Sequence, residues 1–174
     1  MTTKHHNSLD GVYSRAAYSA CETYRYCLER KWGEEKSLCF IMLNPSTATE
    51  QQNDPTVERC ERRARAGGYG SLIVLNIFAY RATDPRDMKA VFDPIGKENN
   101  KFIELTLMLS RSESTDIVCG WGTHGSFMDR EKQVFEMFRK YRVVPKALDW
   151  TKHGHPKHPL YVPYKNQPHE KPYA

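Results

Sequence analysis

Several polar side chains with useful chemistry lie in or directly after strongly apolar stretches of the chain. Asn44 follows the apolar run LCFIML, and its carboxamide offers donors and an acceptor that can orient a water or contact the edge of a base. Asn76 lies inside the run SLIVLNIF, where an unsatisfied amide costs about 1–3 kcal/mol, so it either bonds to a neighbouring loop or faces a ligand. The other candidate ligand-binding residues near these runs and near DIVCGW are Pro45, Ser46, Thr47, Arg81, Thr83, Asp84, Trp121, Gly122 and His124.

Each of these candidates also has an ordinary structural explanation. Asn44, Ser46 or Thr47 could instead cap a turn. Trp121 could pack in the core rather than stack on a base, and His124 is either a ligand donor or a surface residue. One short helix contains four arginines that either contact phosphates or form a solvated basic face, namely Arg59, Arg62, Arg63 and Arg65.

The C-terminal region contains four histidines, His153, His155, His158 and His169. Because an imidazole titrates near neutral pH, His155 and His158 are the candidate catalytic residues beside Asn44. The H-x-H-x-x-H spacing would also suit a metal, but no carboxylate or cysteine stands close in sequence to complete a ligand set. We therefore expect no metal and no other cofactor.

The composition is typical of an intracellular globular protein. The 174 residues carry a formal net charge of +5, which is compatible with a nucleic acid or nucleotide partner and is also common in proteins that bind neither. The five cysteines include no C-x-x-C pair, so a reducing compartment fits best. The polar N-terminus has no signal-peptide core, and no apolar run approaches the roughly 20 residues that cross a bilayer. We expect a cytoplasmic protein without a membrane segment, and the oligomeric state stays open.

The apolar patterning predicts strands that alternate with helices. Strands are expected at residues 24–30, 38–43, 71–78, 116–121 and 143–148, and the first two could form a hairpin. Helices are expected at residues 55–66, 97–111 and 129–141, with Asp54 as the N-cap of the first. This order predicts an α/β fold with three α/β/α layers, a mostly parallel central sheet and an additional N-terminal strand pair.

One domain should position all of these side chains. We expect it at residues 11–165, with a disordered lead at residues 1–10 and a flexible tail at residues 166–174. Open α/β sheets place their ligands at the carboxyl ends of the strands. Polar clusters at residues 44–47, 76–84 and 122–124 all lie at such ends. The pattern therefore predicts that they gather at one site.

Four short segments appear in the order seen in uracil-DNA glycosylases. MLNPS (42–46) resembles the strand-end motif that holds the water-activating residue, with Asn-Pro as in the mismatch-specific and single-strand-selective branches. IVLNIF (73–78) resembles the strand whose Asn reads the uracil edge, and CGWGTHG (119–125) resembles the strand that ends in Trp-Gly. GHPKHPLY (154–161) resembles the late loop that carries a catalytic His. Since this loop is one residue longer than the glycosylase pattern, both of its histidines stay candidates.

The resemblance implies a uracil-DNA glycosylase-like fold and a hydrolase of DNA repair or modification that cleaves the bond between a base and its sugar. Asn44 would position the attacking water, and Asn76 would read the base edge. One of the two late histidines would stabilise the negative charge on the departing base. Leu160, followed by Tyr161, would enter the base stack if the substrate is duplex DNA.

Over nearly its whole length the chain is closer still to the domain-of-unknown-function family 1643, through the segments IMLNPSTA, NDPT, RATDP and HPLY. This second resemblance names no reaction, and two alternatives to the glycosylase remain. A non-catalytic module of the same fold would bind nucleic acid, a modified base or a nucleotide. A hydrolase or transferase of a small phosphorylated metabolite would grip the phosphate with Arg81 and the Ser46-Thr47 loop.

Overall fold

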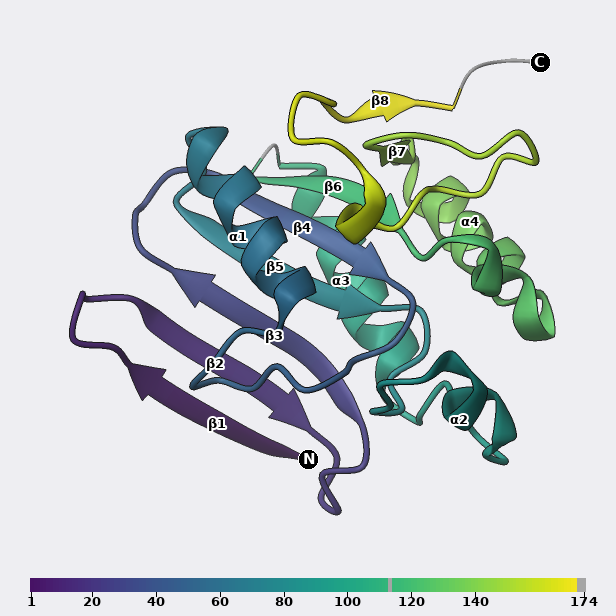
Figure 1. The fold of residues 1–174 in the computed structure, drawn as a ribbon, viewed down its shortest axis with the longest axis horizontal. Coiled ribbons are helices and arrows are strands. Elements are labelled where there is room, and N and C mark those ends of the chain that lie inside the picture. The colour runs from purple at the N-terminus through teal and green to yellow at the C-terminus, as the bar shows by residue number, and fades with distance from the viewer. Residues whose placement is uncertain (113, 172–174) are drawn as a thin grey trace.

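The computed structural model of the protein describes residues 1–112 and 114–171. These residues form one sheet of eight strands in the order β1-β2-β3-β5-β4-β6-β7-β8, with helices on both faces (Figure 1). The strands are β1 (Thr2–Asn7), β2 (Tyr13–Tyr18), β3 (Arg25–Lys31), β4 (Ser37–Met42), β5 (Ser71–Asn76), β6 (Thr115–Gly120), β7 (Lys146–Ala147) and β8 (His169–Glu170). The helices are α1 (Pro55–Ala66), α2 (Pro85–Ala90), α3 (Asn99–Ser110) and α4 (Arg130–Tyr141), with the 3-10 helices η1 (Thr123–Asp129) and η2 (Pro159–Tyr161). None of the helices in this part of the chain is long and apolar enough to cross a membrane.

Three parallel strands at the centre of the sheet carry the core. β4 lies between β5 and β6, and its last residue, Met42, is level with Asn76 of β5 and Gly120 of β6. Successive side chains of β4 point to opposite faces, so Phe40 packs on the side of α1 while Ile41 packs on the side of α3 and α4. The carboxyl ends of the three strands therefore stop at the same level of the sheet.

The prediction of a mostly parallel sheet of uracil-DNA glycosylase type is wrong. Of the seven pairings in the described sheet, four are antiparallel. β1, β2 and β3 follow one another through short connections, which antiparallel strands allow, whereas parallel strands need a long crossover. β3 also pairs with β2 and β5, in place of the expected hairpin with β4. The alternation of strand and helix that supports parallel pairing begins only at β4, and the general α/β class holds.

Both ends of the chain add strands to the sheet. The segment that we expected as a disordered lead contains β1, which pairs along its whole length with β2. The expected flexible tail contains β8, which pairs with β7. Residues 172–174 of that tail lie outside the described residues.

Helix α1 begins at the expected N-cap. Asp54 Oδ1 accepts hydrogen bonds from the backbone N–H groups of Thr56 and Val57 at 3.0 and 2.9 Å. Pro55 occupies the first helical position, where the missing N–H costs nothing. The helix is therefore anchored at its start, and it lies against the face of the sheet formed by β4 and β5 (Figure 1).

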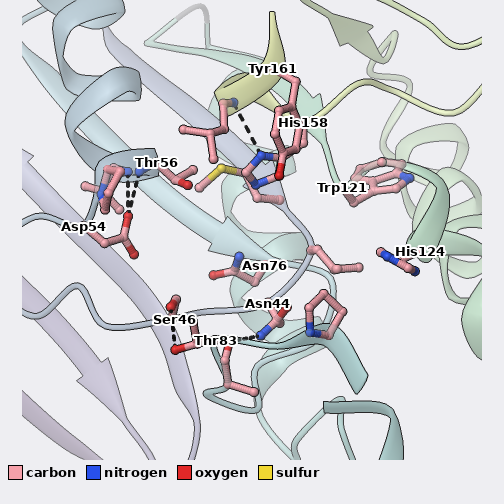
Figure 2. Close-up of a pocket in the computed structure, with 18 of the residues that line it drawn as sticks. Asn44, Ser46, Asp54, Thr56, Asn76, Thr83, Trp121, His124, His158 and Tyr161 are labelled. Atoms are coloured by element: carbon pink, nitrogen blue, oxygen red, sulfur yellow. Dashed lines mark hydrogen bonds between the residues drawn. The ribbon is translucent and has the colours of Figure 1, made fainter. Parts of the chain in front are cut away.

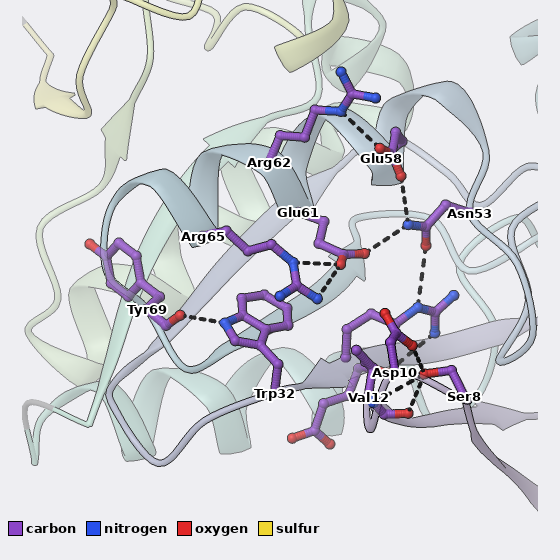
Figure 3. A network of polar contacts seen from close by, with 12 residues as sticks. Ser8, Asp10, Val12, Trp32, Asn53, Glu58, Glu61, Arg62, Arg65 and Tyr69 are labelled. Carbon is purple, nitrogen blue, oxygen red and sulfur yellow. Dashed lines mark hydrogen bonds and ion pairs between the residues drawn. The ribbon is translucent and has the colours of Figure 1, made fainter.

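A polar network ties α1 to the antiparallel half of the sheet (Figure 3). Asn53, just before the helix, donates through Nδ2 to Glu61 at 2.8 Å and accepts at Oδ1 from Arg30 Nε of β3 at 3.2 Å. Further along the helix, the Arg65 guanidinium lies 4.0 Å from the ring centroid of Trp32. These contacts hold the loop between β4 and α1 against β3.

Candidate functional site

A cavity of about 800 Å³ opens at the carboxyl ends of β4, β5 and β6. This size falls within the range of small-molecule sites. Figure 2 shows that its walls combine residues after the three central strands with the start of α1 and the late loop that contains η2. The predicted site residues that line it are Asn44, Ser46, Thr47, Asn76, Thr83, Trp121, Gly122, His124, His158, Leu160 and Tyr161.

Asn76 is buried in the cavity wall without a hydrogen-bond partner. Asn76 is 2% exposed, and among residues 1–112 and 114–171 neither its Nδ2 nor its Oδ1 finds a hydrogen-bond partner. The backbone at this strand end is held from behind, because Asn99 Nδ2 donates to the carbonyls of Asn76 and Ile77 at 3.0 and 2.9 Å. Arg130 Nε donates to the same Ile77 carbonyl at 2.7 Å. The backbone at this strand end is therefore fixed, while both polar atoms of the Asn76 side chain lack a partner among the described residues.

Asn44 is oriented by the two loops that it joins. Its Nδ2 donates to the carbonyl of Pro45 at 3.1 Å and to the carbonyl of Ala82 at 2.7 Å. Ser46 Oγ adds a contact of 3.2 Å to Thr83 Oγ1. Since both carbonyls require a donor, the amide orientation is settled, and Asn44 Oδ1 is the atom that can accept from a ligand or a water.

His158 presents a neutral imidazole to the cavity. Its Nδ1 accepts a hydrogen bond from the backbone N–H of Leu160 at 3.4 Å, so the ring proton is on Nε2. Burial lowers the pKa of His158 to about 4, and the negative charge of Asp54 opposes this shift only in part. Near neutral pH the ring is thus an uncharged donor. Figure 2 shows His158, Asn76 and Asn44 directed into the same space.

The loop that carries His158 is fastened to α1. Arg59 donates to the carbonyls of Pro159 and Val162 at 3.0 and 2.7 Å. Arg63 donates to the Val162 carbonyl at 2.8 Å and also to the carbonyls of residues 163, 164 and 166. On the other side, a Cβ at Gly120 would stand 2.8 Å from Pro159 Cδ, so the loop approaches the end of β6 more closely than a larger residue allows. Arg59 and Arg63 therefore anchor the loop. The sequence had left phosphate contacts or a solvated basic face as the roles of these arginines.

Trp121 and His155 meet at one carboxylate. Trp121, which is 1% exposed, donates through Nε1 to Glu131 Oε2 at 3.2 Å. His155 Nδ1 lies 2.8 Å from the same oxygen. Trp121 thus belongs to the core and also lines the cavity, whereas His155 lies outside the lining and supports the wall behind it.

Two further residues after β6 lie at the cavity. Gly122 has a φ of 69°, a conformation that favours glycine, and its N–H donates to the Pro156 carbonyl at 2.8 Å. His124 is an exposed lining residue whose Nδ1 lies 3.1 Å from Lys89 Nζ. Partial burial and the charge of Lys89 lower the pKa of His124.

Besides His155, three predicted site residues lie outside the lining. The Pro45 carbonyl accepts hydrogen bonds within the loop pair, as above. Arg81 Nη1 donates to the Glu22 carbonyl at 3.3 Å and so faces the turn between β2 and β3. Asp84 caps α2 by accepting from the N–H of Arg86 at 2.8 Å.

Sequence reasoning missed Arg25, the first residue of β3. It is 1% exposed and lines the cavity, its Nη1 donates to the Ala48 carbonyl at 2.7 Å, and its buried Nε has no partner. Burial lowers the pKa of Arg25 to about 10, and the charge of Asp54 offsets part of that effect. In the sequence, Arg25 stands among alternating bulky and charged residues, and no pattern there separates a buried arginine from an exposed one.

No group of three or more His, Cys, Asp or Glu side chains within residues 1–112 and 114–171 is arranged to hold a metal ion. The lining formed by the described residues offers amides, hydroxyls and imidazoles, together with the carboxylate of Asp54, the ammonium of Lys157 and the buried guanidinium of Arg25.

Comparison with known proteins identifies a family and no reaction. Residues 25–160 match the family described as protein of unknown function, DUF1643. No curated protein and no solved structure matches the chain significantly. The matched segment begins at Arg25 and ends at Leu160, while the cavity lining runs from Arg25 to Tyr161, so the match covers nearly the whole site. Because it also covers most of the chain, the protein belongs to the DUF1643 family.

Proposed function

We propose that the cavity binds a nucleobase and that the protein hydrolyses the N-glycosidic bond of a nucleotide or a DNA base. The observation that carries this proposal is the buried amide of Asn76, with a donor and an acceptor both unpaired beside Asn44 and His158. Each unsatisfied buried group costs about 1–3 kcal/mol. A base edge presents an acceptor next to a donor, and one such edge would satisfy both atoms of the amide.

His158 is suited to the departing base. In the hydrolysis the bond between sugar and base breaks, and the electron pair leaves with the base. A neutral imidazole that donates from Nε2 stabilises such developing negative charge without needing to be protonated first. His155 points to Glu131 and lies outside the lining, so of the two candidates His158 takes this role.

Asn44 is suited to the attacking water. Its Nδ2 is held by two carbonyls, so Oδ1 accepts one hydrogen of a water and aims the water oxygen at the sugar carbon. The water hydroxyl bonds to that carbon, and the remaining proton neutralises the released base. Because an amide is not a base, Asn44 contributes orientation, in the sense of a near-attack geometry.

The test is base release from a substrate panel. The protein is incubated with oligonucleotides that carry uracil, mismatched or modified bases, and with free nucleosides and nucleotides, and abasic sites and free bases are measured. Replacing His158 by Phe keeps a ring and removes the donor, and we expect kcat to fall by about 10²–10³-fold with little change in binding. Asn44→Ala should likewise slow release more than it weakens binding. His155→Gln is the matched control and should retain turnover; undiminished turnover in both His158→Phe and Asn44→Ala would remove the mechanism.

One observation favours a second candidate, a binding module that does not cleave. Asp54 is the only carboxylate in the lining formed by the described residues. Asp54 Oδ1 accepts from the N–H groups of Thr56 and Val57, and Oδ2 accepts from that of Ala48 at 3.4 Å, so this carboxylate is engaged as the N-cap of α1. Tight binding of a panel member that depends on Asn76, without any released base, identifies the module.

A further inference from the structure

We infer that the ligand carries a terminal phosphate and that Arg25 receives it inside the cavity, which makes a free nucleoside monophosphate the substrate class. This inference rests on the proposed function, which supplies the base, and extends it to the other end of the ligand. It replaces Arg81, the residue that the sequence assigned to a phosphate, because the side chain of Arg81 faces Glu22 and lies outside the lining.

Arg25 has donor capacity that the protein leaves unused. A guanidinium carries five N–H donors, and the hydrogen bond from Nη1 to the Ala48 carbonyl uses one of them. The buried Nε has no partner among the residues that the structure describes. A carbonyl contact alone would not require an arginine here, because any neutral donor of similar reach could hold the loop.

The charge of Arg25 is also left without a paired anion. The other cationic residue in the described lining, Lys157, forms an ion pair with Asp149 at 2.7 Å, whereas Arg25 forms none. The charge of Asp54 acts on Arg25 and offsets part of the effect of burial, but no ion pair joins these two side chains in the described residues, and Asp54 Oδ1 instead accepts from two backbone N–H groups. Burying a charge without a partner is costly, and an anionic ligand group would remove that cost.

Burial decides between a terminal phosphate and a phosphodiester. Arg25 is 1% exposed and forms part of the wall of a cavity of about 800 Å³. A phosphodiester within a nucleic acid chain would need a path into and out of this wall for the sugars on both sides. A monophosphate ends at the phosphate, and a planar guanidinium can bind two of its oxygens at once.

The experiment measures dissociation constants by titration calorimetry for a panel of nucleosides and their 5′-monophosphates, with inorganic phosphate as a separate probe. We expect at least one monophosphate to bind the wild-type protein about tenfold or more tightly than its nucleoside. In Arg25→Gln, which keeps a side-chain amide on β3 and removes the charge, this ratio should fall to about one.

Arg30→Gln is the matched control. Arg30 is also buried on β3 and also donates to carbonyls of the loop between β4 and α1, namely those of Thr49 and Gln52, but it does not line the cavity. The variant should lose stability in thermal unfolding and still retain the preference for the monophosphate. If Arg30→Gln and Arg25→Gln lose the preference equally, Arg25 only anchors the loop and the inference is wrong.

The two proposals fail in different ways. If nucleosides bind and Asn76→Leu lowers their affinity, but the monophosphates bind the wild type no more tightly than the nucleosides, the phosphate inference falls and the proposed function stands. If neither nucleosides nor their monophosphates bind, the proposed function and the nucleoside monophosphate both fall; inorganic phosphate that binds the wild type and not Arg25→Gln then retains only the assignment of Arg25 to a phosphate. An oligonucleotide without terminal phosphate that binds as tightly as the monophosphate, and loses that binding in Arg25→Gln, overturns the choice of a terminal phosphate.

Discussion

At the scale of single residues, the site consists of side chains whose environment differs from what their type leads one to expect. Asn76 could be singled out from the sequence because an amide inside an apolar strand is costly wherever it points. The sequence narrowed the candidate histidines of the late loop to two. Only the structure separates them, because His158 lines the cavity whereas His155 contacts Glu131. Arg25 could not be found at all, because its burial depends on the partner strands of β3 rather than on its neighbours in sequence.

The pKa of His158 gives a residue-scale prediction on stability. The folded chain holds this imidazole neutral down to a pKa of about 4, whereas the ordinary value is 6.5, so between these values the unfolded chain binds more protons. Stability therefore falls as pH drops through this window. From this residue alone we expect the free energy of unfolding to be lower at pH 5 than at pH 7 by about 2 kcal/mol. Urea denaturation at both pH values measures it, and His158→Phe should lose that part of the difference; an equal slope in the variant would contradict the assignment.

At the scale of elements, the buried runs and the helix caps could be predicted because each leaves a local mark. β4, β5 and β6 are continuous apolar runs, and α1 starts at Asp54 with Pro55 and stops before Gly67. The anchoring of η2 could not be predicted, because it joins residues about a hundred positions apart. Four arginines on one helix look alike in sequence. Only the structure shows that Arg59 and Arg63 hold the late loop, whereas Arg62 pairs with Glu58 and Arg65 lies over Trp32.

This difference between arginines gives the element-scale prediction. Arg59→Leu removes two hydrogen bonds to loop carbonyls and the contact with the ring of Tyr164, whose centroid lies 4.2 Å away. We expect a loss of about 1–3 kcal/mol in the free energy of unfolding, together with weaker ligand binding, although Arg59 does not line the cavity.

The control is Arg62→Leu on the same helix. Arg62 is an exposed residue that pairs with Glu58 at 2.8 Å, and such surface pairs contribute about 0–1 kcal/mol. Urea denaturation and calorimetry compare the two variants. If Arg62→Leu weakens binding as much as Arg59→Leu does, the loop is not held in the way that the contacts indicate.

At the scale of the whole molecule, the sheet topology separates what could be predicted from what could not. The alternation of strands and helices implies that β5, β4 and β6 are parallel. The sequence could therefore predict that the polar residues after these strands gather at one edge of the sheet. The antiparallel half was misjudged because β1 is mostly polar and exposed, so it leaves no apolar signal, and because β3 pairs with a strand two steps later in the sequence. That half holds the loop of the site through Tyr18, Arg25 and Arg30.

Two changes test how this half serves the cavity. Deletion of residues 1–9 removes β1, none of whose residues lines the cavity, so we expect ligand binding to stay intact. The six lost cross-strand pairs, at about 0.2–1 kcal/mol each, should lower stability by a few kcal/mol.

Tyr18→Phe removes the hydrogen bond of 3.0 Å from the hydroxyl to Glu50 in the loop between β4 and α1. We expect this variant to lose about 1–3 kcal/mol in the free energy of unfolding and also to bind the ligand more weakly. Calorimetry measures ligand binding and urea denaturation measures stability for both variants. If the deletion weakens binding and Tyr18→Phe leaves it intact, these roles of β1 and Tyr18 are wrong.

The attachment of the late loop to α1 has a consequence for the time at which the cavity is completed. A chain leaves the ribosome from its N-terminus, so β1 through α1 can associate while residues 159–166 are still being made. During that interval Arg59 and Arg63 face water in place of carbonyls, and the cavity lacks the wall that contains His158. A nascent chain therefore completes the cavity only after residues 159–166 have been made, and a chain that stops before them lacks the wall that contains His158.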